Sequence, residues 1–412
     1  MNETVAADRI EPHQLAAAYL ADDTVKRCPY DLLATLRATA PVVRSAGGPW
    51  LVLDYQAGQS VLRNPVFSRS RAAADTLRSF IDPGPAADIW MSKMVSTDGE
   101  RHRRLRGLVN KAFTPRAVER WRPVVQAHAD EILRTTHEQH HMEAVSEYAY
   151  PLPEHVICAL LGVPASDRAL FEGWTAAIQN RVVTGRGAES ARTAAGQAIL
   201  GFAAYLTELV SAHEPNPEGD LLSQLASAEE EGSRLSQQEL VSVAMELIIG
   251  GHDTTANLIT IGVYELARRP GLFSSFARGE FSIAGLVEEL MRARSPVQLS
   301  LSRVATQTVE VAGHVIEAGD VVLVSLAAAN RDPSAFPSPE TFDPSKPAPN
   351  HIGFGVGAHY CLGANLARLE AQVALAAVLE RLAGLHLTVG EAELTWREGS
   401  LVIAPARLPV AW

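Results

Sequence analysis

Cys361 is the residue of this sequence whose surroundings most clearly indicate chemistry. It lies in the run FGVGAHYCLG, residues 354–363, after a glycine-rich stretch and before a strongly helical segment, 365–382. The free amides and the positive dipole end of a helix start favour the anionic form of a nearby sulfur. Three glycines in the run allow the backbone to turn its N–H groups toward that sulfur. We therefore expect a thiolate at position 361, acting as a nucleophile, a redox sensor or a metal ligand.

The other cysteines do not support a zinc or disulfide-exchange site. Cys28 and Cys158 are remote in sequence, and the chain has no Cys-x-x-Cys pair. His351 and His359 could be imagined as zinc ligands, but a structural zinc site needs four ligands. A buried, inert cysteine is the usual state of a lone thiol in an apolar helix. That interpretation does not explain the glycines and the aromatic residue around Cys361.

A second unusual segment is GGHDTT, residues 250–255, in the middle of a long apolar helical pattern. Each glycine costs about 0.5–1 kcal/mol relative to alanine in a helix interior. Asp253 and Thr254 are poor helix formers whose side chains compete for backbone hydrogen bonds. The segment indicates either a structural kink or a functional bulge. Gly250 and Gly251 would leave room for a flat cofactor and a small diatomic ligand.

Both segments resemble signatures of the cytochrome P450 family, the haem-thiolate monooxygenases. The first matches Phe-x-x-Gly-x-His/Arg-x-Cys-x-Gly at Phe354, Gly357, His359, Cys361 and Gly363. The second is similar to the Ala/Gly-Gly-x-Asp/Glu-Thr-Thr oxygen-activation motif of that family's central helix. The resemblance implies haem b with its iron bound by Cys361, whose thiolate favours O–O cleavage. It also implies that Asp253 and Thr254 relay protons to the oxygen, through water, as the catalytic pair.

Haem carries two propionates, and buried propionates need cationic partners. His102 and Arg106 lie four residues apart, so one helix face presents both. A charge run of this kind is usually a solvated helix face, but the family's His-x-x-x-Arg pattern favours a propionate role for these two residues. By the same resemblance, Arg303 and His359 are the other two candidate partners.

A Glu-x-x-Arg motif at Glu289 and Arg292 lies between the two signature segments. Such a motif alone is usually a solvated surface pair, and its position is what gives it weight. The resemblance implies a structural ion pair beneath the haem loop. The family usually completes this cluster with an arginine, but Thr341 stands at the corresponding position here. We expect Arg331 to be the third partner.

The elements that position these residues are mostly helical. Helical patterns cover 98–111, 115–138, 145–161, 189–213, 236–269, 282–293 and 364–383. The segment 236–269 starts with a capping box at Ser236 and Glu239, is followed by Pro270, and spans roughly 50 Å. Strand-like runs are short, at 41–54, 308–325 and around 401–403, and 309–316 reads as a hairpin. We expect a mainly α protein with small β-sheets, a cytochrome P450-like fold whose long central helix lies over the haem.

Composition and charge exclude several classes of protein. The chain has 412 residues, 47% hydrophobic and 20% charged, with a net charge of −11, which argues against a nucleic-acid binder. No apolar run of about 18 residues predicts a membrane span, and the N-terminus lacks a signal-peptide layout. Three unpaired cysteines fit a reducing compartment. We expect a cytoplasmic monomer with one catalytic domain over 1–412, flexible over about 1–15.

The function expected from these features is insertion of one oxygen atom of O2 into an apolar organic substrate, by hydroxylation or epoxidation. The chain has no flavin or iron–sulfur segment, so electrons come ultimately from NAD(P)H through a ferredoxin or flavodoxin and its reductase. The basic helix, with Lys111 and Arg116, offers a docking patch. Two alternatives remain: a catalytically silent haem-binding or carrier-recognition protein, and a peroxide-driven haem-thiolate enzyme. Both usually lack the acid–alcohol pair, which is intact here.

The substrate pocket is expected to draw on 72–95, 165–205, 243–249, 296–300 and 401–403. Trp90, Met91 and Met94 are candidate lining residues, because methionines and adaptable loops suit a bulky apolar ligand. The bacterial-type members that this chain resembles often tailor secondary metabolites such as polyketides, macrolides or terpenoids. The sequence does not identify the molecule.

Overall fold

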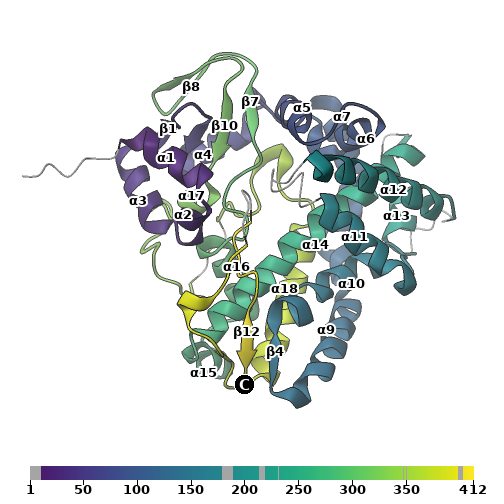
Figure 1. The fold of residues 1–412 in the computed structure, drawn as a ribbon, viewed down its shortest axis with the longest axis vertical. Helices are drawn as coiled ribbons and strands as arrows, with labels where there is room; N and C mark the ends of the chain where they lie inside the picture. The colour runs from purple at the N-terminus through teal and green to yellow at the C-terminus, as the bar shows by residue number, and fades with distance from the viewer. Residues whose placement is uncertain are drawn as a thin grey trace, which may run out of the picture.

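The computed structural model describes residues 11–178, 189–212, 219–230, 232–346, 348, 350–397 and 402–412. It is mostly helical with small sheets, as the sequence predicted (Figure 1). The first half of the chain contains the helices α1 Pro12–Ala21, α2 Asp23–Arg27, α3 Tyr30–Thr39, α4 Tyr55–Arg63, α5 Arg69–Phe80, α6 Pro85–Ser92, α7 Gly99–Asn110, α8 Pro115–Glu119, α9 Arg122–Thr136, α10 Pro151–Leu160 and α11 Arg168–Ile178. The second half contains α12 Glu189–Ala212, α13 Leu221–Ser227, α14 Gln237–Ala267, α15 Gly271–Ala277, α16 Ile283–Ala293, α17 Leu326–Ala329 and α18 Ala364–Arg381.

The strands form small sheets at the edges of the helical body. Their bounds are β1 Val42–Arg44, β2 Trp50–Val52, β3 Phe67–Ser68, β4 His141–Glu143, β5 Glu229–Glu230, β6 Ser233–Arg234, β7 Arg303–Ala305, β8 Val309–Val311, β9 His314–Ile316, β10 Val321–Val324, β11 His386–Leu387 and β12 Pro409–Ala411. The largest sheet has the order β1-β2-β10-β7-β3, in which only β2 and β10 are parallel. The predicted hairpin is confirmed as β8 and β9, with Val311 opposite His314.

Helix α14 is the central element of the molecule and crosses it diagonally in Figure 1. Its predicted capping box is present, with Ser236 and Glu239 each accepting a backbone N–H of the other. From Leu240 onward most of its side chains are buried. It packs against α10, α12 and α18. A Cβ on Gly262 would lie 2.6 Å from Leu375 Cδ1, so this glycine makes room for a leucine of α18.

Two predicted helices are interrupted, in both cases next to a proline. The segment predicted over 115–138 divides into α8 and α9 at residues 120–121, just before Pro123. The segment predicted over 145–161 is a π-helical turn, Val145–Ala149, followed by α10, which starts at Pro151. Proline lacks a backbone N–H and is accommodated in the first turn of a helix rather than in its interior. The continuous helices predicted from hydrophobic periodicity were therefore wrong at these positions.

Other expectations differ in detail from the structure. No helix was predicted before residue 98, whereas α1 to α6 all lie there. The strand expected around 401–403 is reduced to a single bridge between Val402 and Val297, and Leu401 lies outside the described residues. The expected flexible segment 1–15 falls mostly outside them too. In the described part of the chain, no helix is long and apolar enough to cross a membrane.

The Glu289–Arg292 pair joins α16 to the segment that leads to Cys361. The guanidinium donates to both carboxylate oxygens, at 2.8 and 2.7 Å, and both side chains are buried. It also donates to the backbone carbonyls of Pro339 and Thr341, at 2.8 and 2.9 Å. Backbone carbonyls thus occupy the place where a third side chain was expected. The prediction of Arg331 was wrong, because that guanidinium pairs with Glu340 and donates to Ala293 O.

We expect Glu289→Ala to destabilise the protein by about 3–5 kcal/mol, because it leaves the Arg292 charge buried without its carboxylate. The exposed pair of Arg278 and Glu280 provides a control, and Glu280→Ala should change stability far less than Glu289→Ala does. Thermal and denaturant unfolding of the two variants would measure the difference. Equal losses in both variants would show that the buried pair does not secure this region.

Candidate functional site

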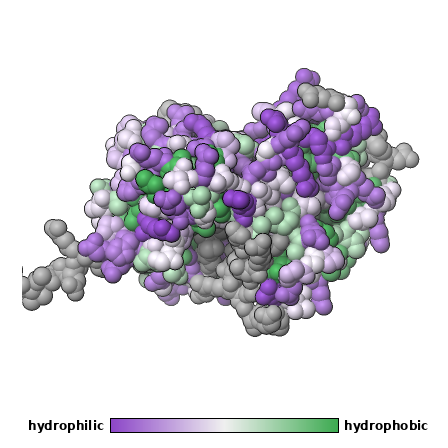
Figure 2. All heavy atoms as spheres, turned by 90° about the horizontal axis from the view of Figure 1, so that it is seen from above, coloured by the Kyte–Doolittle hydropathy of each residue, from purple (hydrophilic) through white to green (hydrophobic). Residues whose placement is uncertain are grey.

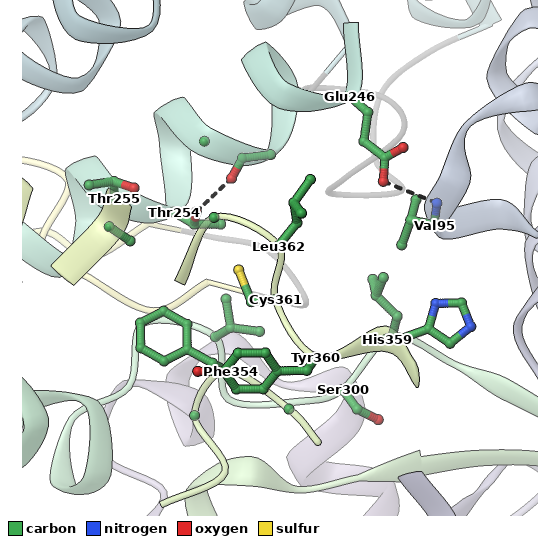
Figure 3. Close-up of a pocket in the computed structure, with 18 of the residues that line it drawn as sticks. Val95, Glu246, Thr254, Thr255, Ser300, Phe354, His359, Tyr360, Cys361 and Leu362 are labelled. Carbon is green, nitrogen blue, oxygen red and sulfur yellow. Dashed lines mark hydrogen bonds between the residues drawn. The ribbon is translucent and has the colours of Figure 1, made fainter. Parts of the chain in front are cut away.

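A cavity of about 360 Å³ lies between α14 and the loop that carries Cys361. Figure 3 shows the Cys361 sulfur beneath α14, with Thr254 above it and the rings of Phe354 and Tyr360 below it. The remaining walls come from the segment after α16, from β7 and from the segment between α6 and α7. Most of the lining is apolar, and it also contains charged and imidazole side chains. Seen from above, the molecule is hollowed between two lobes with largely hydrophilic surfaces (Figure 2).

The Cys361 loop depends on glycines at two points. Gly355 and Gly357 have φ values of 70° and 80°, in the left-handed region that favours glycine. A Cβ on Gly357 would lie 2.8 Å from the carbonyl oxygen of Leu62, which is a backbone atom. The loop is closed by the Cys361 N–H, which donates to Phe354 O at 2.9 Å. Helix α18 then begins at Ala364, as the sequence predicted.

The surroundings of Cys361 act on its thiol in opposite directions. The side chain is exposed, yet desolvation by the surrounding protein raises the pKa of this thiol, against the lowering effects of the Gly363 backbone, Arg106 and Arg368. A coordinated metal ion would remove the thiol proton outright. The sulfur faces the cavity, where such an ion could bind.

A network of polar side chains supports the loop from below. Arg368 on α18 donates to the Tyr360 hydroxyl at 3.1 Å, and its guanidinium lies 4.4 Å from the Phe354 ring centroid. The same guanidinium donates to Glu288 of α16 at 2.6 and 3.0 Å. His351 contacts Glu288 at 3.0 Å. These contacts connect the residues on both sides of the sulfur to α16.

The opposite wall is a continuous stretch of α14. Helical geometry persists through 250–255, so the bulge proposed from the sequence is absent there. The Thr254 hydroxyl donates to the Gly250 carbonyl at 2.7 Å, a bond to the preceding turn that leaves the helix intact. No atom lies within 4 Å of the Cβ position of either Gly250 or Gly251. The two glycines and Thr254 therefore present an open surface to the cavity.

Asp253 lies on a different face of α14 from Thr254 and is not among the residues that line the cavity. Its Oδ1 accepts hydrogen bonds from the Tyr150 hydroxyl at 2.5 Å and from Arg397 at 2.7 Å. Asn257 donates to the Tyr150 hydroxyl at 3.1 Å. Burial raises the pKa of Asp253 to about 6, while its hydrogen bond with Asn257 lowers it. The structure thus separates the two members of the predicted acid–alcohol pair.

The four predicted propionate partners meet on one side of the cavity. His102, Arg106, Arg303 and His359 all line it. The two imidazole rings lie 4.2 Å apart, and His359 Nε2 is 3.1 Å from Asp98 Oδ1. Burial, together with the charges of His359 and Arg106, lowers the pKa of His102 to about 4. These side chains come from α7, β7 and the Cys361 loop.

Sequence reasoning missed several charged groups of the cavity. Arg69, the first residue of α5, is buried beside Arg303 and donates to Ser302 O. Glu246 of α14 and Glu370 of α18 also line the cavity, and burial raises the pKa of each. Glu246 is a charged residue one turn before Gly250 in an apolar stretch of sequence, and this pattern could have indicated a polar group in the cavity. Nothing in the local sequence indicates Arg69 or Glu370.

The expected pocket walls are present only in part. Met94 lines the cavity, as do residues from 243–249 and 296–300. Trp90 and Met91 pack instead against the core. Of the described residues in 165–205 and 401–403, none appears in the lining, and residues 179–188 and Leu401 lie outside the described part.

The walls fit a haem group. Arg303 Nε is buried without a hydrogen-bond partner in the structure, as expected of a guanidinium that awaits an anion. Gly250, Gly251 and Gly363 face space that a Cβ would reach into. Cys361 places a sulfur between these surfaces, and sulfur is an axial ligand of haem iron. In the described part of the chain, no cluster of three or more His, Cys, Asp or Glu side chains could hold a metal ion, so Cys361 would not bind as part of such a set.

Comparison with known proteins identifies a family. The profile of the cytochrome P450 family matches residues 198–275 and 284–405. Cytochrome P450 monooxygenase PikC of Streptomyces venezuelae is 38% identical over 93% of this chain and 91% of its own. The mycinamicin IV hydroxylase/epoxidase of Micromonospora griseorubida is 37% identical over 92% and 94%.

A solved structure agrees with these matches over almost the whole chain. P450BioI, crystallised in complex with an acyl carrier protein ligated to hexadec-9Z-enoic acid, superposes with a TM-score of 0.84. It is 30% identical, and the match covers 94% of this chain and 99% of that one. The similarity therefore includes both walls of the cavity.

We expect Glu288→Gln to lower stability at neutral pH and to lower it less as the solution is acidified. Burial alone would raise the pKa of Glu288, but hydrogen bonds from His351 and Arg368 lower it to about 2. A carboxyl group whose pKa is lower in the folded protein stabilises fully above its unfolded pKa, and this stabilisation is lost as pH falls through the folded pKa.

The measurement is the unfolding midpoint of wild type and variant between pH 7 and pH 3.5. Their difference should narrow below about pH 4.5, the ordinary range of a glutamate. Glu380→Gln, on the exposed face of α18, is the control. A difference that does not change with pH would contradict the role given to the Glu288 charge.

Proposed function

This chain belongs to the cytochrome P450 family, and on that premise we propose that it inserts one oxygen atom of O2 into an apolar organic substrate in the tailoring of a secondary metabolite. Its relatives are monooxygenases and hydroxylases, which makes it an oxidoreductase. The observation that carries the proposal is the position of the Cys361 sulfur, across the cavity from Gly250, Gly251 and Thr254. The reaction is a hydroxylation or an epoxidation.

In this proposal Cys361 holds the iron of haem b and four side chains bind its propionates. Arg106 and Arg303 supply permanent positive charge, and His102 and His359 supply ring nitrogens as hydrogen-bond donors. Phe354, Gly250 and Gly251 form the surfaces against which the flat group packs. When bound, the haem supplies the activation of O2 that no amino-acid side chain provides. The side chains around the haem bind the substrate, exclude water and transfer protons.

The apolar walls bind the substrate and exclude water from the cavity. Leu247, Val297 and Leu299 are among the residues that form them, and they contact a substrate without reacting with it. Thr254 Oγ1 lies at the inner surface of the cavity, where it holds a proton beside the reacting atoms. Its bond to the Gly250 carbonyl fixes the direction of the hydroxyl.

Asp253 supplies protons to this hydroxyl through water. Burial raises the pKa of this carboxyl group toward neutrality, which favours proton uptake, while the ion pair with Arg397 favours its ionised form. The carboxylate must leave its contacts with Tyr150 and Arg397 in order to face Thr254. The strength of the hydrogen bonds from Tyr150 and Arg397 therefore determines how readily Asp253 delivers a proton to Thr254.

The electrons come from NAD(P)H through a ferredoxin or flavodoxin and its reductase. An acidic partner of this kind fits the exposed arginines Arg101 and Arg103 of α7 and Arg116 of α8. Lys111, which was expected to belong to this patch, contacts Glu229 O and lies 3.7 Å from Glu230. Its charge is thus partly compensated within the chain.

The first test is reduction of the haem-loaded protein under carbon monoxide. A thiolate ligand predicts a strongly red-shifted Soret band, and Cys361→His should abolish that shift. Cys28→Ser, which changes an exposed cysteine, should retain it. A folded wild-type protein whose band is not shifted would overturn the proposal.

The second test separates Thr254 from a matched threonine on the same helix. Thr260 also donates to the carbonyl four residues earlier, but it is buried away from the cavity. Thr254→Val should lower product formed per electron pair by about 100-fold, the usual size of a lost proton-transfer group. Thr260→Val should leave this ratio unchanged. Product formation that is equal in both variants would remove Thr254 from the proton route.

A further inference from the structure

Glu246 is a carboxylate that lines the cavity and whose charge interacts with Lys93, Arg69 and Arg106. It lies on α14 one turn before Gly250, and Figure 3 shows its carboxylate pointing toward the neighbouring backbone of Val95. Its Oε1 accepts the Val95 backbone N–H at 3.0 Å. Its Oε2 is buried and has no hydrogen-bond partner in the structure. A buried acceptor without a donor is costly, so a donor from a bound molecule would be favoured there.

The charge of Glu246 is already matched by the protein. Lys93, in the segment after α6, is buried with its Nζ 2.8 Å from the ring centroid of Trp90, and it interacts electrostatically with Glu246. Burial raises the pKa of Glu246 and lowers that of Lys93, while each group opposes the shift of the other. Whether both groups are ionised or both are neutral, their charges sum to zero. Glu246 therefore offers an acceptor without calling for a cation.

Two guanidinium groups of the cavity, those of Arg106 and Arg69, also interact electrostatically with Glu246, and Arg106 is one of the proposed propionate partners. The Arg69 guanidinium donates a hydrogen bond to Ser302 O. It lies near Arg303 and Asp98, whose charges also act on it. An ammonium group at Glu246 would bring a further cation close to Lys93 and Arg69. A carboxylate there would face the carboxylate of Glu246. A hydroxyl group meets neither repulsion.

We propose that Glu246 is a substrate-anchoring residue whose free Oε2 accepts a hydrogen bond from a hydroxyl group of an uncharged and otherwise apolar substrate. The inference rests on the proposed function and specifies the substrate class of the same site. The anchor lies one helical turn from Gly250. It would therefore hold the hydroxyl away from the sulfur side of the cavity and leave an apolar part of the substrate near Thr254.

Four matched probes test the proposal on the haem-loaded full-length protein: 1-decanol, decyl methyl ether, decanoate and decyltrimethylammonium. All four carry the same kind of apolar chain, but their head groups differ in charge and in whether they can donate a hydrogen bond. Binding is measured by calorimetry and by optical titration of the Soret band. We expect 1-decanol to bind at least about tenfold more tightly than each of the other three, the size of a hydrogen bond to a charged acceptor.

Two variants separate the hydrogen bond from the charge. Glu246→Leu removes the acceptor, so 1-decanol should lose its advantage over the ether. Glu246→Gln keeps a carbonyl acceptor and leaves Lys93 unmatched, so the alcohol should stay ahead of the ether while decanoate gains affinity. Glu208→Gln removes the same charge from an exposed position on α12 and should preserve the wild-type order.

The proposal is overturned if the ether equals 1-decanol, if a charged probe binds most tightly, if none of the four binds, or if Glu246→Leu keeps the preference for the alcohol. Each protein is also reduced under carbon monoxide. A shifted Soret band together with any of these outcomes would reject the role of Glu246 and leave the proposed function standing. Absence of the band would reject the proposed function itself.

Discussion

The close packing of α14 against α18 is the contact on which the site depends. Cys361 lies three residues before α18, and Gly250, Gly251 and Thr254 lie on α14, so the separation of the two helices sets the separation of the cavity walls. Gly262 receives Leu375 where a side chain on α14 would collide with it. Helix α16 is then joined to α18 through Glu288 and Arg368, and to the segment before Cys361 through Arg292, which donates to the Pro339 and Thr341 carbonyls. A flat cofactor with a sulfur ligand needs this spacing before any chemistry begins.

Charge is distributed unevenly around the cavity. Arg69, Arg106 and Arg303 line the cavity as guanidinium groups suited to propionates, and Glu246 and Glu370 are the carboxyl groups of its lining. Asp253 belongs to neither group, because Tyr150 and Arg397 hold it on another face of α14. We propose that the arginines bind an anionic ligand, that Glu246 anchors the substrate, and that Asp253 supplies protons from another face of the helix. Each of these groups has a distinct chemical role in that proposal.

The sequence allowed prediction of features that depend on neighbouring residues. The glycine-rich run before Cys361, the capping box of α14 and the 309–316 hairpin are local patterns, and the structure contains all three. Prediction failed where distant parts of the chain meet. Arg397 reaches Asp253 from 144 positions away, and the backbone carbonyls of Pro339 and Thr341 replace an expected side chain at Arg292. The prediction of a bulge over 250–255 was wrong for another reason. The Thr254 hydroxyl donates to the carbonyl of Gly250 in the previous turn, and the helix backbone stays regular.

The central claim is that the Cys361 sulfur binds haem iron beneath Gly250 and Gly251, with the propionates on Arg106 and Arg303. A crystal structure of the haem-loaded protein measures this directly. The account predicts sulfur bound to the iron, α14 over the opposite face of the haem, and both propionates on the side of those two arginines. Iron held by a histidine, or haem with its propionates toward Glu246, would contradict it.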